Sequence, residues 1–299
     1  MNFSPIVIFT YNRPSHLNEL FKTLEKNDES KKSDVFIYID RYENEIDKDA
    51  NEQVLKISDK NWKFKSKKII YRDEHIGLKT NILTGISEIL ENFEKIIVLE
   101  DDLLVSPYFL KFMNESLEKY KNNKEVWHVS GYSMDTLLND KRSTYFTSEM
   151  NCWGWGTWQD RWINIQDNLT NKVSQLSPKE VKNFNFYGKN KNNLNQLVLN
   201  EEKKISTWAI FWYQTIFLNG GLCLNPSKSF VQNNGFDGKG ANKSSSNFYR
   251  IDNLNIYDNY NFPSAIKRNK LREKLVVYRY MKKNLKDYFM YHLNKLIKV

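Results

Sequence analysis

The 299-residue sequence predicts an α/β fold with a mostly parallel sheet flanked by helices. Apolar, strand-like runs alternate with helical patterns within the first hundred residues. One of these runs, 96–99, consists of four branched aliphatic residues, as expected of a strand buried on both faces. A content of 40% hydrophobic residues is sufficient for a large core in a chain of this length.

The first part of the chain repeats a strand, a loop and a helix. We expect strands at 3–10, 34–40, 68–71 and 96–99, and helices from about Leu17, weakly around 54–57, and from 78 to 92. The carboxyl ends of parallel strands form the ligand crevice of such sheets, so we assign residues 1–131 to a nucleotide-binding half.

The pattern changes after the fourth strand. Short alternating runs at 126–131 and 143–147, polar helical material at 178–204, a buried helix at 205–219 and a strand at 222–224 predict a smaller mixed part, residues 132–266. Within it, 232–248 is rich in glycine, asparagine and serine. This stretch reads either as a flexible lid that closes over a ligand or as an ordinary linker.

Residues 267–299 form a basic tail. Residues 265–299 hold eleven Lys or Arg against two acids, which leaves the remaining chain with 34 residues of each sign. Apolar residues recur in the tail at steps of three and four: Leu271, Leu275, Tyr278, Met281, Leu285, Tyr288, Phe289, His292, Leu293 and Leu296. This amphipathic helix either binds an anionic inner membrane surface or packs its apolar stripe on the body.

Composition also excludes several classes. A neutral body with a basic tail disfavours a nucleic-acid enzyme. Cys152 and Cys223 lack metal-type spacing, which predicts reduced thiols and no zinc site. The chain shows no leader pattern and no run of about twenty apolar residues, so we expect a cytoplasmic protein, peripheral on the inner membrane if the tail binds lipid.

Three adjacent carboxylates, Glu100, Asp101 and Asp102, directly follow the buried strand 96–99. Their mutual repulsion favours a bound cation, and a hard divalent metal prefers oxygen ligands. In an extended chain Glu100 and Asp102 point to one side and Asp101 to the other. The alternative is an exposed acidic turn. Ser106 and Pro107 then predict the N-cap and first residue of a helix.

Other polar and aromatic residues surround these predicted strand ends. The loop Tyr11–Pro14 follows the first strand without a glycine-rich phosphate fingerprint. Asp40 ends the second strand and is either a ligand contact or a helix cap. Four tryptophans in 153–162 are interrupted by glycines and offer either a stacking platform for sugars and bases or an aromatic cluster under a turn.

Together these motifs resemble a known family. Ile-Phe-Thr-Tyr-Asn-Arg-Pro at 8–14, the strand end at Asp40, Val-Leu-Glu-Asp-Asp-Leu at 98–103 and the tryptophan stretch look like a bacterial GT-A glycosyltransferase, similar to the N-acetylglucosaminyltransferase I type, over roughly residues 3–250. The resemblance implies a nucleoside-diphosphate sugar donor, most often UDP-linked, a Mn²⁺ or Mg²⁺ ion, and an attacking acceptor hydroxyl.

The resemblance also implies roles for individual residues. Asp102 would bind the metal with support from Glu100, Asp101 would face the ribose or sugar, and Asp40 would accept from the uracil imide. The remaining donor-binding candidates are Thr10, Asn12, Arg13 and Lys79. The part at 132–266 would bind the acceptor, with Trp153, Trp155 and Asp237 as acceptor or lid residues.

The general base is the least defined role. Inverting relatives carry a carboxylate before the tryptophan that corresponds to Trp208, whereas this chain has Ser206 and Thr207, which cannot act as bases at neutral pH. Asp160 is the first candidate, Glu149 the second and Asp237 the third.

Three functions therefore stay open. The first is a metal-dependent inverting glycosyltransferase acting on a glycan or lipid-linked acceptor of the bacterial surface. The second is a nucleotidyltransferase, disfavoured by the missing glycine-rich loop. The third is a non-catalytic relative that binds sugar nucleotides or glycans.

Overall fold

A computed structural model describes residues 2–134, 140–188, 192–236, 249, 251 and 253–282. Its main sheet has eight strands in the order β3-β2-β1-β4-β8-β6-β9-β7, and β10 and β5 form a two-stranded sheet. The strands are β1 (Ile6–Thr10), β2 (Asp34–Ile39), β3 (Ser66–Tyr71), β4 (Lys95–Glu100), β5 (Leu103–Val105), β6 (Val126–Ser130), β7 (Thr144–Thr147), β8 (Trp155–Trp158), β9 (Leu222–Pro226) and β10 (Val231–Asn233).

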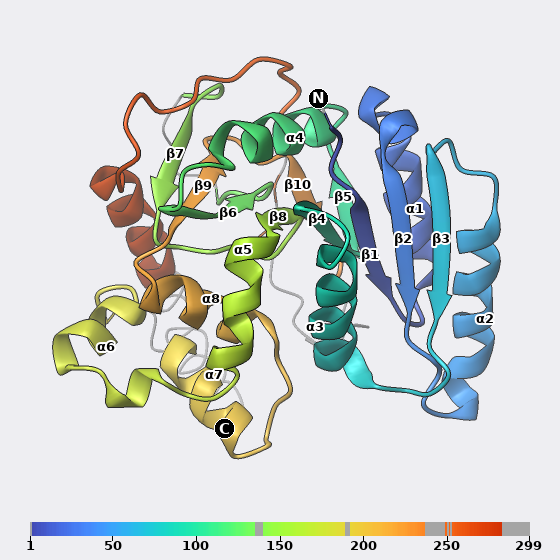
Figure 1. Cartoon of the computed structure of the whole chain (residues 1–299), viewed down its shortest axis with the longest axis horizontal. Coiled ribbons are helices and arrows are strands. Elements are labelled where there is room, and N and C mark those ends of the chain that lie inside the picture. Colours follow the sequence, from blue (N-terminus) through green and yellow to red (C-terminus); the bar gives the residue numbers. More distant parts are fainter. Residues whose placement is uncertain are drawn as a thin grey trace, which may run out of the picture.

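Helices cover both faces of the sheet (Figure 1). The α-helices are α1 (Pro14–Leu24), α2 (Glu45–Asp59), α3 (Gly77–Leu90), α4 (Phe109–Tyr120), α5 (Gln159–Trp162), α6 (Pro178–Phe184), α7 (Asn192–Glu201) and α8 (Ala209–Leu218). Three 3-10 helices occur at Asp28–Lys32, Ile163–Asn168 and Val173–Gln175. The described chain ends in a helix at 270–282. The expected α/β class, with helices around a mostly parallel sheet and a C-terminal helix, is confirmed.

Strand direction places the functional edge of the sheet. β1 to β4 are parallel neighbours, and β8 runs antiparallel to both β4 and β6. Because β6 pairs in parallel with β9, the strands β1, β2, β3, β4, β6 and β9 all point the same way. We call the edge at which these strands end the carboxyl edge.

The alternation of side chains along the strands divides the core in two. Ile6, Ile8, Ile97 and Leu99 pack on one face with residues of α1 and α4. Val7, Phe9, Ile96 and Val98 pack on the other face with α3 and a group of tryptophans. Alternate side chains of these strands therefore face opposite sides of the sheet, and both sides are buried. This is the pattern of a covered central strand, as predicted for 96–99.

One local prediction beside the acids was wrong. Ser106 and Pro107 do not start a helix: β5 follows the acids, and α4 begins at Phe109. Ser106 instead closes a turn, in which its hydroxyl accepts from the Tyr108 amide and its own amide donates to the Phe230 carbonyl. Backbone hydrogen bonds to β10 hold the segment after the acids in a strand instead of a helix. Val105 pairs with Val231, 126 residues later, and local sequence patterns cannot predict such a pairing.

The predicted apolar stripe of the C-terminal helix faces the body only in part, since the half-buried Met281 packs against the core. Leu271 and Tyr278 are 60% and 49% exposed, whereas Arg272, Glu273, Val276 and Val277 are buried. The physical reason is that buried polar partners hold the opposite face, since Glu273 accepts from Arg268, the Ser148 amide and Tyr187. Residues 283–299 lie outside the described part, and no helix in that part is long and apolar enough to span a bilayer.

Candidate functional site

The three acids lie at the carboxyl edge, where β4 ends. Phe9 of β1 pairs with Glu100, and the Asp101 amide donates to the Phe9 carbonyl at 3.1 Å. Burial, followed by the repulsion of the neighbouring carboxylates, raises the pKa of Glu100 and of Asp101. Burial likewise raises the pKa of Asp102, against the opposing effect of Arg13. Three carboxyl groups therefore share this edge, and their charged forms are costly there without a compensating cation.

Arg13 compensates part of this charge. Its Nη1 lies 3.0 Å from Asp102 Oδ2, and the two side chains are 17% and 19% exposed. Arg13 comes from the loop between β1 and α1, and Pro14 starts the helix directly after it. The cation expected beside the acids is thus present as a side chain of the same protein.

Asp101 differs from the expectation. Its Oδ2 accepts from the Thr10 hydroxyl at 2.7 Å, and the residue is only 8% exposed. It lies in the tight turn between β4 and β5, so the strand alternation predicted for it does not continue. The hydrogen bond between Asp101 and Thr10 joins the ends of β4 and β1. Glu100 and Asp102 are therefore the acids nearer to solvent.

Asp40 forms the helix cap that was the alternative for it. Its carboxylate accepts from the Ile76 amide at 3.0 Å and the Gly77 amide at 2.9 Å, and His75 Nδ1 lies 3.0 Å away. Asp40 is 3% exposed. These bonds fix the N-terminus of α3, and they account for the buried carboxylate without a uracil contact.

The other donor-site candidates also bond within the protein. Asn12 donates to Asp47 at 2.7 Å, and the Tyr11 hydroxyl donates to the same carboxylate at 3.0 Å. Lys79 lies over the Phe211 ring at 4.0 Å, and burial lowers its pKa. Asn12 therefore orders the loop that carries Arg13, whereas Lys79 packs against α8.

Cys152, which precedes Trp153, approaches the acids from the second half of the chain. Burial, and then the carboxylates of Glu100 and Asp102, raise the pKa of the half-buried Cys152 thiol. Trp153 packs edge-on against Tyr132 at 4.6 Å and Tyr249 at 5.4 Å between ring centroids. Cys152 was not a sequence candidate, because a single cysteine without spaced partners carries no signal of its own.

Trp155 is corrected from a sugar platform to a core residue. It is fully buried, stacks on Trp208 at 5.5 Å and packs against His128 at 5.1 Å. The glycines of this stretch do not expose ring faces. A Cβ on Gly156 would lie 2.7 Å from the Ile96 carbonyl oxygen, and Gly154 has φ +60°, so close strand approach and a left-handed turn require them.

The start of the expected lid rests on Asp102. The Asn234 amide donates to the Asp102 carbonyl at 2.8 Å. A Cβ on Gly235 would lie 2.1 Å from Asp102 Oδ2, so only glycine allows this approach. Asp237 and the rest of 237–248 lie outside the described residues.

Asp160 is wrong as the candidate base. Trp158 of β8 pairs with Lys95, the first residue of β4, so Asp160 lies beyond the edge opposite to Glu100. There it forms ion pairs with Lys124 and Arg161. The antiparallel direction of β8 carries the chain away from the acids, which sequence spacing alone did not reveal.

Glu149 is buried away from the three acids. It is 7% exposed and accepts from the Tyr280 hydroxyl at 3.1 Å. Burial raises its pKa to about 7, with Tyr280 lowering it and Glu273 raising it further. These neighbours belong to the C-terminal helix, so Glu149 joins that helix to the body.

Glu100 and Asp102, the two acids nearer to solvent, suit a metal ion whose other ligands come mainly from the substrate. In the described part of the chain no group of three or more His, Cys, Asp or Glu side chains is arranged to hold a metal ion. Mg²⁺ typically binds through one or two carboxylates and completes its shell with substrate phosphates and water. Glu100 and Asp102 match that donor set once Arg13 moves from Asp102.

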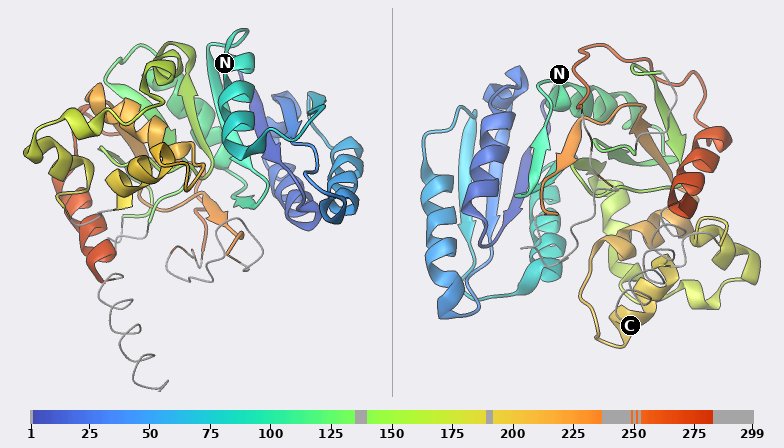
Figure 2. Two further views of the ribbon diagram at one scale, coloured as in Figure 1. Left: turned by 90° about the horizontal axis from the view of Figure 1, so that it is seen from below. Right: turned by 180° about the vertical axis from the view of Figure 1, so that it is seen from behind.

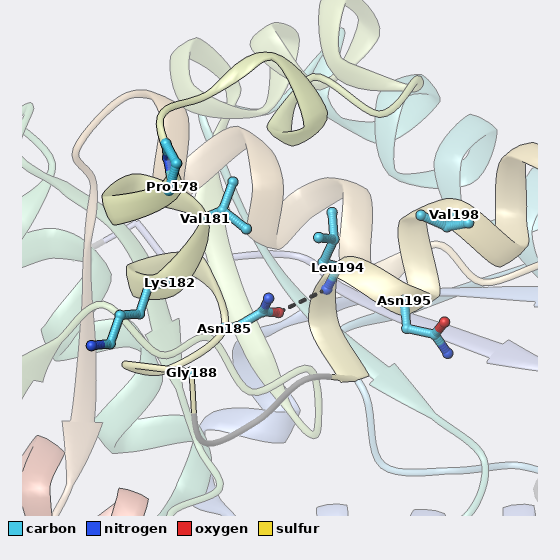
Figure 3. Close-up of a pocket in the computed structure, with 8 residues that line it drawn as sticks. All are labelled: Pro178, Val181, Lys182, Asn185, Gly188, Leu194, Asn195 and Val198. Carbon is cyan, nitrogen blue, oxygen red and sulfur yellow. Dashed lines mark hydrogen bonds between the residues drawn. The ribbon is translucent and has the colours of Figure 1, made fainter.

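A separate hollow of about 530 Å³ lies between α6 and α7 (Figure 3). Eight residues line it: Pro178, Val181, Lys182, Asn185, Gly188, Leu194, Asn195 and Val198. Asn185 Oδ1 accepts from the Leu194 amide at 2.9 Å and joins the two helices. With no acidic or histidine side chain in its lining, the hollow lacks the usual side-chain ligands of a metal ion.

Comparison with known proteins identifies no family. No family model and no curated protein matches the chain. Among solved structures, one of S. aureus TarS aligns with 56% of this chain and 30% of that one at 14% identity and TM-score 0.38. TarS 1-349 in complex with UDP-GlcNAc aligns with 42% and 33% at 12% identity and TM-score 0.31.

The chain thus spans about a third of the length of those structures. A likeness this weak carries no argument, and the functional reading rests on the residues at the carboxyl edge.

Proposed function

We propose that the protein is a metal-dependent glycosyltransferase that moves a sugar from a nucleoside-diphosphate donor, UDP-linked by preference, to an acceptor hydroxyl. The observation that carries this proposal is the juxtaposition of Glu100, Asp102 and Arg13 at the carboxyl edge. The carboxylates can bind a divalent metal ion, and the long arginine side chain can reach the phosphates that the metal ion accompanies. This combination suits a diphosphate with its metal ion better than a neutral ligand.

Each residue would have a distinct task. Glu100 and Asp102 would hold Mn²⁺ or Mg²⁺, which neutralises the charge of a leaving diphosphate. Arg13 would move from Asp102 to the phosphate oxygens and form charge-assisted hydrogen bonds. Asp101, Thr10 and Asp40 would keep the strand ends and the start of α3 in place rather than touch the donor.

The acceptor side is proposed around Trp153. The half-buried indole, packed by Tyr132 and Tyr249 and next in the chain to Cys152, offers an apolar surface on which a sugar ring could stack. The acceptor would be a glycan or a lipid-linked glycan of the bacterial surface, and a lipid-linked acceptor would bring the protein to the inner membrane. An inverting reaction remains part of the proposal, with Asp237 as its remaining candidate base.

A second candidate function is binding of sugar nucleotides without turnover. The observation that favours it is the absence of a suitably placed base among the described candidates, since Asp160 lies at the opposite edge and Glu149 is buried under Tyr280. A nucleotidyltransferase is less favoured because the β1–α1 loop lacks glycine.

The test is a panel of nucleotide sugars incubated with Mn²⁺, with release of the nucleoside diphosphate as readout. Turnover of one donor supports the transferase, and saturable binding without release supports the binding protein. Asp102→Asn should lose metal-dependent donor binding, whereas Asp160→Asn, an equal change at the opposite edge, should retain it. Normal donor and metal binding by Asp102→Asn would contradict the site.

A further inference from the structure

The outward face of the C-terminal helix at 270–282 combines apolar and cationic side chains. Leu271, Leu275, Tyr278 and Lys282 follow one another at steps of three and four, and Lys274 lies three residues after Leu271 and four before Tyr278, so the five share one side of the helix. Leu271 is 60% and Tyr278 49% exposed, and both lysines are exposed. The Lys282 ammonium lies 5.2 Å from the centre of the Tyr278 ring, consistent with their common side.

The opposite face holds the helix on the body. Arg272 donates to the Ser227 hydroxyl at 2.9 Å and lies over the Tyr145 ring at 4.8 Å. Glu273, 1% exposed, accepts from Arg268 at 2.8 Å. Val276 and Val277 are buried between these polar contacts and Tyr280.

This helix differs from an ordinary surface helix in carrying apolar side chains on both faces. Amphipathic helices usually bury their apolar stripe in the core and leave charges outside. Here Arg272 and Glu273 are buried together with Val276 and Val277. Leu271, Tyr278 and the half-exposed Leu275 lie on the outer side among lysines. The helix lies at the side of the molecule away from β1 to β3 (Figure 2).

We propose that this outward face is a docking surface for an anionic phospholipid surface. Apolar side chains that alternate with lysines on one side of a helix are the composition of interfacial helices, in which rings and aliphatic chains enter the headgroup boundary and ammonium groups contact phosphates. The acid of this segment, Glu273, lies on the buried side, so the outward charge is positive and complements such a surface.

The buried side chains of Arg272 and Glu273 give the surface a fixed orientation. A helix tethered only by its end would approach lipid in any direction, whereas Arg272 and Glu273 hold this one with its outward face away from the body. Tyr280 on the inner side donates to Glu149, three residues before Cys152, so the same helix is connected to the segment that reaches the acids. Docking through this helix would therefore hold the folded body in one orientation relative to the membrane.

The test measures cosedimentation of the full chain with vesicles of phosphatidylcholine containing about 30% phosphatidylglycerol, and with vesicles of phosphatidylcholine alone. Each lysine near an anionic leaflet contributes about fivefold to partitioning, so Lys274→Gln/Lys282→Gln should weaken binding about 25-fold. The matched control Lys22→Gln/Lys26→Gln removes the same charge from exposed positions on and after α1 and should bind as the unmodified chain does.

An apolar variant separates lipid insertion from simple charge attraction. Leu271→Ser/Tyr278→Ser keeps every charge, and it should lose the part of vesicle binding that persists at about 0.5 M salt, where charge attraction is largely screened. Both positions are exposed, so the fold should not change, and circular dichroism checks this.

Three results would overturn the proposal: equal binding to both kinds of vesicle, equal effects of the outward-face and control lysine pairs, or a dimer in solution that Leu271→Ser/Tyr278→Ser dissociates while vesicles are ignored. Donor turnover in the absence of vesicles is independent of all three. Failure of this surface and failure of the proposed transferase activity are therefore distinguishable.

Discussion

Replacing Arg13 by glutamine tests whether this side chain occupies the cation position of the acidic site. The ion pair joins Arg13 Nη1 to Asp102 Oδ2 at 3.0 Å. Two unit charges about 4 Å apart attract by about 4 kcal/mol at an effective dielectric constant of 20. Both side chains are almost one fifth exposed, so solvent screens their attraction. We therefore expect the variant to lose about 2 kcal/mol of unfolding free energy.

The same variant should respond more strongly to metal. Without Arg13, Asp102 has lost its cationic partner beside two further carboxylates, so Mn²⁺ has more repulsion to relieve and no side chain to displace. We expect Mn²⁺ alone to bind Arg13→Gln at least about tenfold more tightly than the unmodified protein, a difference of about 1.4 kcal/mol. UDP should bind the variant more weakly, since the phosphate contact is lost.

The assay is urea unfolding followed by circular dichroism, together with calorimetric titration of Mn²⁺ and UDP. Lys22→Gln is the matched control, because it removes one positive charge from α1 and an exposed pair with Glu19. That control should change the unfolding free energy by less than about 0.5 kcal/mol. Arg13→Gln with unchanged stability and unchanged Mn²⁺ affinity would refute the reasoning.

Three further predictions concern the parts that surround the site. The raised pKa of Glu149, about 7 when folded against 4.5 for the free side chain, means that the folded state binds the extra proton. Stability should therefore fall by about 3 kcal/mol as the pH rises from 4.5 through 7, and Glu149→Gln should flatten this profile in urea unfolding. Gly154→Ala should cost at least about 1 kcal/mol, since φ is +60° and the new Cβ would meet Val231 at 2.8 Å, and fluorescence of Trp153 should shift. An unshifted spectrum with wild-type stability would contradict that role of Gly154. Deleting 267–299 should destabilise the body by about 4 kcal/mol or more, because Val276 and Val277 leave the core and Glu149 loses Tyr280; a truncated chain of unchanged midpoint would show that the helix is dispensable.

The segment 267–299 belongs in part to the folded body. Removing 267–299 is the simplest way to delete a membrane-binding tail. The buried contacts of Arg272 and Glu273 show that the deletion also removes part of the folded body. Substitutions on the outward face avoid this difficulty.

The wrong predictions share a cause. Asp160 follows the tryptophans at a reasonable spacing, but antiparallel pairing of β8 with β4 carries it to the opposite edge. Trp155 is flanked by glycines, but these glycines serve close strand approach, and the ring is buried. In both cases the deciding contact is with a strand more than fifty residues earlier, which local spacing does not encode.

The sequence by itself determined the alternation of strands and helices from β1 to β4, and hence the position of Glu100, Asp101 and Asp102 at a strand end. These features follow from local hydrophobic periodicity, which is written in consecutive residues. Tertiary structure decided which acid meets Arg13, that Asp40 caps α3, that Gly235 covers Asp102, and that the C-terminal helix turns part of its apolar stripe outward. Each of these depends on hydrogen bonds and packing between segments distant in the chain, and such pairings are selected by the free energy of the whole fold rather than by any one stretch.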